Sequence, residues 1–352
     1  MSNFSSISYE PLVIVSNALS GGGAEKSMLA LHQEFLKKGI ISYLIVLNKT
    51  VSVNDMENIK ELNRKWKDGV RSTLLNFLDF KNTIAKINPK TVIVNCELPE
   101  LYMSLLKSRK MRVICVEHTS VPWHNMRFIG VCVRLLLKYK KVEWVTVVKG
   151  KKEIWISSNN SKYISNPYIG FSNYLKASGA KPSLVFIGGI KKNKRPDWVI
   201  EAGIKNKLSI HLYGEGQLIQ TLKAKYSNLV HNIEFHGFKS NVWDLIPSNS
   251  LIVVPSEFEG DGMVIIEAII SRFPLVLAWN KDLIKFGLEE KHYFKTLNEL
   301  ILIVEQNMEN NFKNLVVADK FVESLNKQRS LELIVSDWVS LLRESNFIVN
   351  RK

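Results

Sequence analysis

Short apolar runs alternate with longer amphipathic stretches along most of the chain. In the first half, apolar runs predict buried strands at residues 12–16, 44–47, 91–94, 113–116 and 144–148. Apolar residues recur every three to four positions at 24–38, 71–87 and 128–140, which predicts helices there. Strands that alternate with helices in this way are typical of α/β domains with parallel sheets.

A cluster of turn-forming residues at 165–173 interrupts this pattern, which then restarts. Strands are predicted at 183–187, 209–213, 233–236, 251–254 and 275–278, and helices at 196–204, from about 263, and at 330–344. Glycines follow several of these strands, which predicts loops at the carboxyl edge of the sheet, where open α/β sheets bind ligands. We therefore predict a first domain at 1–165, a linker at 166–182, a second domain at 183–325 and a C-terminal helical segment at 326–352.

The composition agrees with two globular domains. The 352 residues are 46% hydrophobic and 23% charged. No apolar run reaches the roughly 18 residues of a membrane span, and the N-terminus lacks the basic-then-apolar order of a secretory signal, so we expect a cytoplasmic protein. Cys96, Cys115 and Cys132 stand singly in apolar stretches, and we expect buried, reduced thiols.

Positive charge is concentrated in the first half. The net charge is +15, and residues 1–165 hold 25 lysines and arginines against 13 acidic residues. Such a surface attracts nucleic acid, anionic lipid or phosphorylated substrates, or serves solubility alone. Basic and apolar residues mix at 59–67 (with Trp66), 105–112 and 127–141. The last stretch, with Arg134, Lys138, Lys140 and Lys141, fits either a helix on an anionic membrane or an ordinary packed helix.

The most specific segment is Pro255-Ser-Glu-Phe-Glu-Gly-Asp-Gly-Met-Val-Ile-Ile-Glu-Ala268. It places Glu259 and Glu267 on either side of a glycine-rich turn that joins a strand to a helix. The N-terminus of such a helix favours an anionic ligand. Two carboxylates in these positions can accept hydrogen bonds from two sets of hydroxyls, such as a sugar and a ribose separated by a diphosphate.

This segment resembles the E-x7-E signature of the family-4 glycosyltransferases. Five further stretches resemble other landmarks of that family: Gly21-Gly-Gly-Ala-Glu-Lys26, Asn166-Pro167, Phe186 to Asp197, Tyr213-Gly-Glu-Gly216 and Phe235-His-Gly-Phe238. The resemblance implies the α/β GT-B fold, with two facing Rossmann-like domains, a cleft between them and a C-terminal helix that crosses back to the first domain. It also implies retaining transfer of a hexose from a nucleotide-diphosphate sugar, most commonly a UDP-sugar, without a metal or other cofactor.

The resemblance assigns donor-binding roles to particular residues of the second half. Glu267 would bind the ribose hydroxyls, and Glu259 the hydroxyls of the transferred sugar. Backbone groups at Asp261, Gly262 and Met263 would contact the sugar and the diphosphate.

Basic residues are expected to neutralise the leaving diphosphate. The resemblance gives this role to Lys194. The family usually has an arginine where this chain has Gly189, and Arg195, Lys191 or Lys192 could compensate for it.

In the first half, Gly22 and Gly23 would let the backbone approach the donor phosphates. His118, directly after a strand, resembles the active-site histidine of the first domain, and Glu117 is its candidate neighbour. As an isolated residue, His118 would read as an ordinary loop histidine. The other histidines show no ligand spacing, so no metal site is predicted.

The acceptor in this family normally lies against the first domain, and the positive charge there favours a lipid-linked saccharide acceptor. We expect a peripheral enzyme at the inner face of the cytoplasmic membrane, acting in lipopolysaccharide, O-antigen or capsule biosynthesis. The alternatives are a sugar-nucleotide epimerase of the same fold, a non-catalytic nucleotide-sugar-binding protein and a basic nucleic-acid-binding protein. The E-x7-E pattern disfavours the first, and intact Glu259, Glu267 and Lys194 disfavour the second. No RNA- or DNA-binding motif supports the third, so nucleic acid is not an expected partner.

Overall fold

A computed structural model describes residues 10–19, 22–48, 57–64, 70–107, 111–119, 123, 126–148, 161–167, 181–239 and 241–344. The chain divides into two compact units, residues 1–169 together with 329–352, and residues 170–328. Within the described part of the chain, no helix is both long enough and apolar enough to cross a bilayer.

The first unit is built on a parallel seven-stranded sheet in the order β3-β2-β1-β4-β5-β6-β7. The strands are β1 (Leu12–Ser16), β2 (Ser42–Asn48), β3 (Ile59–Arg64), β4 (Thr91–Asn95), β5 (Arg112–Glu117), β6 (Glu143–Thr146) and β7 (Lys162–Tyr163). The central strands are buried on both faces, which explains why they read as continuous apolar runs.

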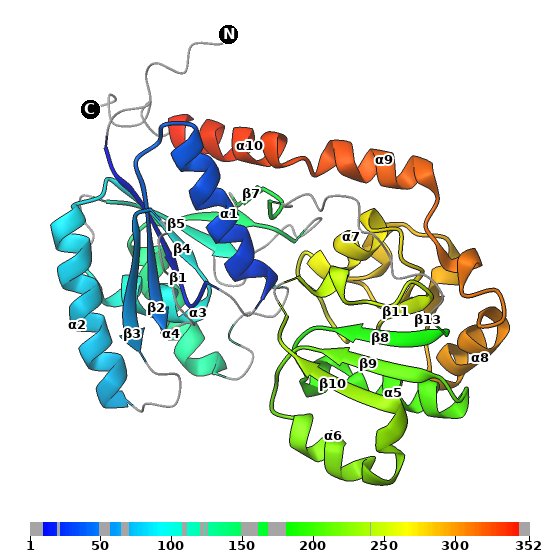
Figure 1. The fold of residues 1–352 in the computed structure, drawn as a ribbon. Helices are drawn as coiled ribbons and strands as arrows, with labels where there is room; N and C mark the ends of the chain where they lie inside the picture. Colours follow the sequence, from blue (N-terminus) through cyan, green and yellow to red (C-terminus); the bar gives the residue numbers. More distant parts are fainter. Residues whose placement is uncertain are drawn as a thin grey trace. The chain divides into compact units, whose positions relative to one another are not determined.

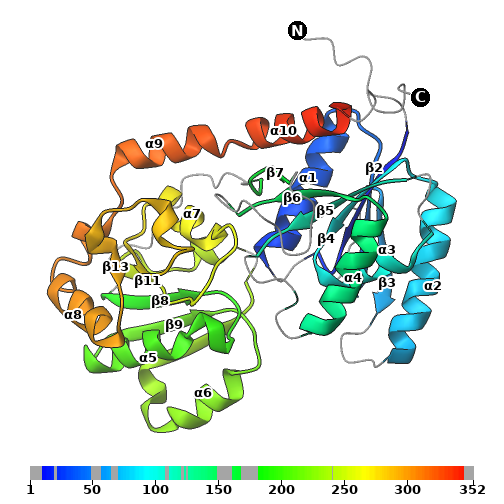
Figure 2. The same ribbon diagram turned by 180° about the vertical axis from the view of Figure 1, so that it is seen from behind.

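Helices cover both faces of this sheet (Figures 1 and 2). Helices α1 (Gly23–Lys37) and α10 (Leu331–Glu344) pack on one face, where Phe35 and Trp338 share a core with strand residues. Helices α2 (Val70–Ile87), α3 (Glu97–Leu105) and α4 (Arg127–Tyr139) cover the other face. Arg112 secures α10 because its guanidinium donates to the carbonyl oxygens of Leu341 and Leu342 at 3.0 and 3.2 Å.

The second unit is built on a parallel six-stranded sheet in the order β10-β9-β8-β11-β12-β13. Its strands are β8 (Ser183–Ile187), β9 (Ser209–Tyr213), β10 (Ile233–Gly237), β11 (Ser250–Val254), β12 (Leu275–Ala278) and β13 (Tyr293–Phe294). Its helices are α5 (Pro196–Lys205), α6 (Ile219–Lys225), α7 (Met263–Ile270), α8 (Leu297–Asn307) and α9 (Asp319–Gln328). One continuous apolar core joins the sheet to these helices.

The predicted strands and helices agree with the structure to within two residues at each described boundary. The sequence pattern missed β3, α3, β7, α6, α8, α9 and β13. Strand β3 was missed because the charged residues Lys60 and Glu61 hide its alternation, and it lies at the edge of its sheet. Helix α3 was missed because it is short, contains Pro99 and begins at Glu97, only two residues after β4 ends.

The expectation of three buried thiols is wrong, because Cys115 is buried but Cys96 is only partly so. Cys132 is exposed rather than buried, because it lies on the outer side of α4. In the basic stretch at 127–141, Arg134 is buried among carboxylates, and Lys140 donates to the backbone oxygens of Met103 and Leu106 at 2.8 and 2.6 Å. Gly21, Trp66 and most of the predicted linker lie outside the described residues.

Candidate functional site

Three strands of the second unit end in loops that are bound to one another. The backbone N–H groups of Gly188 and Gly214 donate to the carbonyl oxygens of Tyr213 and Gly237, at 2.9 and 2.8 Å. Gly214 has a φ of +137°, and a side chain there would overlap the carbonyl oxygen of Gly188. A side chain on Gly216 would likewise overlap Ile190. These glycines are therefore required by close backbone packing at the carboxyl edge of the sheet.

The loop between β11 and α7 carries the two predicted carboxylates. Gly262 immediately precedes α7 with a φ of +69°, a left-handed conformation that favours glycine. A Cβ atom on Gly262 would lie 2.6 Å from the ring of Phe286. Helix α7 begins at Met263 as predicted, and its positive dipole end adjoins the loop that carries Glu259 and the buried Asp261.

Glu259 and Lys194 come together although they lie far apart in the sequence. The Lys194 ammonium forms an ion pair with Glu259, and both side chains are partly buried. The Ser256 hydroxyl donates to the same carboxylate at 2.8 Å, and the Glu259 backbone N–H donates to Asp282 Oδ2 at 3.2 Å. Glu259 is thus held at the sheet edge beside a lysine ammonium.

The other two predicted charged residues of this unit have partners of their own. Trp243 Nε1 donates to Glu267 Oε2 at 2.9 Å, which orients that carboxylate. Arg195 has left-handed backbone angles, pairs with Glu257 at 2.9 Å and lies over the ring of Trp198. Arg195 therefore contacts Glu257 rather than the Lys194–Glu259 pair.

Gly189 occupies an open position. A Cβ atom placed on it would have Lys191 Cε as its nearest neighbour, at 3.4 Å. No positive φ requires glycine there. A Cβ atom is therefore tolerated at position 189, where the resemblance leads us to expect an arginine.

Several residues that support this site were not found from the sequence. Lys285 Nζ donates to the carbonyl oxygen of Gly260 at 2.7 Å, and Asn280 Nδ2 donates to that of Ser256 at 2.8 Å. Asn280 and Asp282 directly follow β12, so the rule that polar residues after buried strands gather at one edge could have identified them.

In the first unit, Gly22 and Gly23 lie at the start of α1. Gly22 is extended, with a φ of −155°, and Gly23 is the first helical residue. A Cβ atom on Gly22 would approach the Glu25 carboxylate at 2.7 Å. Helix α1, which begins with its positive dipole end, is the next element in the chain after the carboxyl end of β1.

His118 directly follows β5, and both of its ring nitrogens are unusual because they are buried without a hydrogen bond to any residue that the structure describes. Burial lowers the pKa of His118 to about 4, so the imidazole is neutral at pH 7. Buried imidazole nitrogens normally find a partner, which makes this position a candidate for contact with a ligand.

A buried cluster of charges includes Glu117, the residue before His118. Arg134 on α4 pairs with Glu117 at 2.6 Å and with Glu100 on α3 at 2.8 Å. Trp123, which follows His118 in the same connection, donates through Nε1 to Glu100 at 2.7 Å. Burial raises the pKa of Glu100 to about 7, and Glu117 adds to this shift. The predicted neighbour Glu117 thus belongs to an ion cluster that links the His118 connection to α3 and α4.

Polar residues also gather where β1, β2 and β4 end. Asn95 Nδ2 donates to Ser16 Oγ at 3.0 Å, and Asn48 Nδ2 donates to the Asn17 carbonyl at 2.9 Å. The side-chain oxygens of Asn17 and Asn95 are buried, and neither has a hydrogen-bond partner within the described ranges. These residues each lie at or just after an apolar strand, which is the signal that could have revealed them.

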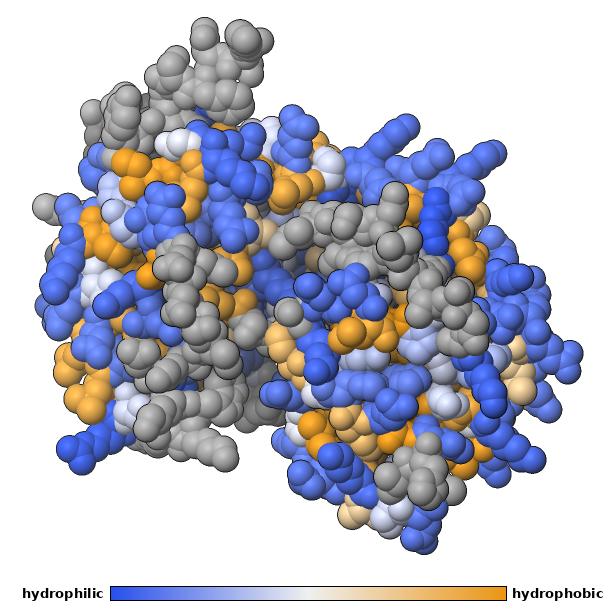
Figure 3. All heavy atoms as spheres, in the orientation of Figure 1, coloured by the Kyte–Doolittle hydropathy of each residue, from blue (hydrophilic) through white to orange (hydrophobic). Residues whose placement is uncertain are grey.

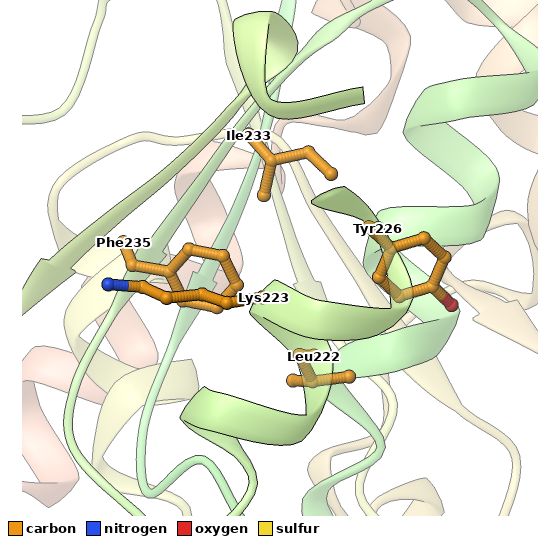
Figure 4. Close-up of a pocket in the computed structure, with 5 residues that line it drawn as sticks. All are labelled: Leu222, Lys223, Tyr226, Ile233 and Phe235. Carbon is orange, nitrogen blue, oxygen red and sulfur yellow. The ribbon is translucent and has the colours of Figure 1, made fainter. Parts of the chain in front are cut away.

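Two other features lie at β10, away from the predicted residues. A cavity of about 270 Å³ is lined by Leu222, Lys223, Tyr226, Ile233 and Phe235, between α6 and one side of β10 (Figure 4). On alternate positions of the same strand, Glu234 and His236 lie close to His211 of β9. The sequence suggested no metal-ligand spacing, because this group joins residues from two strands.

The family match lies within the second unit. Residues 181–293 match the family model described as glycosyl transferases group 1. The chain is 27% identical over 195 residues to a poly(ribitol-phosphate) alpha-N-acetylglucosaminyltransferase of Staphylococcus aureus, a match that covers 48% of this chain and only 38% of that enzyme. It is 22% identical over 351 residues to an uncharacterized glycosyltransferase of Haemophilus influenzae, covering 93% of this chain and 98% of that protein.

Solved structures extend the likeness to almost the whole chain. HepE of Anabaena, in complex with UDP and glucose, has a TM-score of 0.77 at 14% identity, covering 95% of this chain and 99% of that one. Sucrose-phosphate synthase of Thermosynechococcus elongatus has a TM-score of 0.76 at 14% identity, with coverages of 96% and 100%. The chain therefore has the GT-B fold. Together with the family match, this supports a group 1 glycosyltransferase.

Proposed function

We propose that the protein is a retaining glycosyltransferase that moves a hexose from a nucleotide-diphosphate sugar, UDP-linked in the first instance, to a saccharide acceptor. The observation that carries this proposal is the arrangement of Lys194, Glu259 and the N-terminus of α7 at one sheet edge, within the residues that match the family. A cation and a helix N-terminus suit a diphosphate, and a carboxylate suits sugar hydroxyls.

In the proposed reaction, the acceptor hydroxyl oxygen bonds to the anomeric carbon from the side of the leaving group. The bond between that carbon and the diphosphate oxygen breaks, and the hydroxyl proton passes to the departing phosphate. Lys194 and the first turn of α7 stabilise the charge that develops on the diphosphate. Glu259 holds the sugar, and Glu267, oriented by Trp243, holds the ribose. This scheme gives the protein a positioning and electrostatic role.

For the first unit, we propose that His118 contacts the transferred sugar or the acceptor as a neutral hydrogen-bonding group. Its buried nitrogens and lowered pKa support this role. The ion cluster of Arg134 then acts indirectly, because it anchors the connection through Trp123.

We further propose that the acceptor is lipid-linked and that the enzyme acts at an anionic membrane, in bacterial surface polysaccharide biosynthesis. The outer side of α4 supports this, since Phe128 and Tyr139 are 81% and 87% exposed and Leu135 and Leu136 are also exposed. Apolar side chains also reach the surface over α2 (Figure 3). Lys138 and Lys141 are exposed beside the apolar side of α4 and suit anionic headgroups.

Vesicle sedimentation tests the membrane proposal. We expect wild-type protein to bind vesicles that contain anionic lipid at low salt, and a Phe128→Ser, Tyr139→Ser double variant to bind them markedly less. A Leu302→Ser variant, altered at an exposed apolar residue of α8, is the matched control and should bind like wild type. No binding to anionic vesicles, or equal binding by all three proteins, would contradict a membrane role for α4.

Donor turnover tests the enzymatic proposal. Purified protein is incubated with UDP-, GDP- and ADP-sugars, while thermal stability and released nucleoside diphosphate are measured. We expect one donor to raise the melting temperature and to be hydrolysed slowly. Lys194→Gln should lower its release about 100-fold, because that change removes charge stabilisation from the leaving group. Glu305→Gln, on the exposed side of α8, should leave release unchanged. A folded protein that neither binds nor hydrolyses any donor would contradict the proposal.

A further inference from the structure

A group of three metal-ligand side chains lies on the edge of the second sheet, apart from the proposed donor residues. His211 is on β9, and Glu234 and His236 are on the edge strand β10. Glu234 pairs in register with His211, and His236 lies two positions further along β10. The register of β10 on β9 shifts between Phe235 and Gly237, so His236 lies at an irregularity of the strand. The ligand atoms of the three side chains nevertheless lie within 4.8 Å of one another.

The distances among the three ligand atoms match a metal site. His211 Nδ1 lies 3.1 Å from His236 Nε2, and Glu234 Oε2 lies 3.7 Å from His211 Nδ1 and 3.4 Å from His236 Nε2. Zinc bound tetrahedrally at about 2.0–2.2 Å separates its ligand atoms by about 3.3–3.6 Å. The three atoms need to move by only a few tenths of an ångström to bind one ion.

The surroundings suit a cation that enters from solvent. The Glu234 side chain is 58% exposed, whereas those of His211 and His236 are mostly buried. The ring of Tyr213 stacks on that of His236 with centroids 4.3 Å apart, which fixes the plane of the imidazole. His211 Nδ1 and His236 Nε2 share one hydrogen bond, whose proton a bound ion would displace.

We propose that His211, Glu234 and His236 form a binding site for one divalent transition-metal ion, with zinc as the ion best matched to two imidazoles and one carboxylate. Calcium and magnesium are poorly matched to this site, because they prefer oxygen ligands to imidazole nitrogens. Water completes the coordination on the open side, as is usual for three protein ligands. The bound ion ties the edge strand β10 to β9 and stabilises the second unit. This site is independent of the proposed transferase function.

Zinc titration of the full-length, untagged and chelator-treated protein tests this site. Competition with a chromophoric chelator should show one equivalent of tightly bound zinc. His211→Gln, Glu234→Gln and His236→Gln should each weaken the binding about tenfold or more. Glu305→Gln, which removes an exposed carboxylate elsewhere in the same unit, should bind zinc as wild type does. Circular dichroism checks that each variant is folded, and the exposed Glu234 makes its variant the least disruptive.

Two further readouts separate a site from adventitious uptake. Cobalt bound in place of zinc should give visible absorption bands typical of four or five ligands in wild type but not in Glu234→Gln. Zinc should raise the melting temperature of wild type more than that of the three variants. Absence of zinc uptake by wild type, or equal uptake by wild type and all three variants, would overturn the proposal.

Discussion

The ion cluster next to His118 in the first unit and the ion pairs of the candidate donor site in the second unit differ in their burial. In the first unit, Arg134, Glu100 and Glu117 are almost completely buried and satisfy one another. In the second, the Lys194–Glu259 and Arg195–Glu257 pairs remain partly open to solvent. Buried ion pairs are costly to break, whereas exposed pairs contribute little to stability. The difference indicates that the first cluster is structural and that the second set of charges is accessible to a ligand.

Breaking each kind of pair gives the largest expected contrast. Arg134→Met leaves two buried carboxylates without a counter-charge and should destabilise the protein by about 3–5 kcal/mol. Arg195→Met removes an exposed pair and should cost less than about 1 kcal/mol. Scanning calorimetry of both variants measures the difference. Similar losses for the two would show that the comparison between the units is wrong.

The pH dependence of the free energy of unfolding should show the titration of Glu100. Its pKa is about 7 in the folded chain against an ordinary value of 4.5, so between these pH values the folded state keeps a proton that the unfolded state has lost. The stability that Glu100 contributes is fully present below pH 4.5. The free energy of unfolding then falls by about 3 kcal/mol in all as the pH rises to about 7. His118 acts in the opposite direction, because its lowered pKa of about 4 makes stability rise with pH up to about 6.5.

Glu100→Gln separates these two effects. The variant should lack the loss of stability between pH 4.5 and 7. Its stability relative to wild type should therefore increase with pH over this range. Melting temperatures of both proteins across pH 4 to 8 measure this. A constant difference over the whole range would mean that Glu100 does not titrate there.

Packing of Trp123 predicts a smaller effect on the same region. A methyl group on Gly130 would overlap Trp123, so Gly130→Ala should destabilise by about 1–3 kcal/mol despite the better helix propensity of alanine. Gly189→Ala, where the nearest atom lies at 3.4 Å, is the control and should be close to neutral. If thermal melting shows Gly130→Ala to be stabilised, Trp123 is not packed against α4.

The smallest expected effect concerns the open position 189. Gly189→Arg should fold normally and tighten UDP binding by no more than about tenfold, because it adds one cation beside Lys191. Isothermal calorimetry with UDP compares the variant with wild type. Weaker binding by the arginine variant would show that this position does not face the diphosphate.

Local sequence patterns predicted most of the fold but only part of the site. Strands such as Leu12–Ser16 are continuous apolar runs, and the turn at Gly262 is encoded within a few residues of α7. The contacts between Lys194 and Glu259, and between Arg134 and Glu100, join residues that are 65 and 34 positions apart. No local pattern reports such pairs. For the same reason the sequence left open whether the helix that carries Arg134 lies on a membrane or packs within the domain, and it missed the group at His211.

We propose above that the second unit binds the nucleotide of a sugar donor through Glu267. Isothermal calorimetry of UDP with wild type, Glu267→Gln and the control Glu305→Gln tests it most directly. We expect one saturable site in wild type and in the control. Binding to Glu267→Gln should be about tenfold weaker or lost, because its neutral amide accepts hydrogen bonds from ribose hydroxyls less strongly. Equal binding by all three proteins, or no binding by any of them, would contradict it.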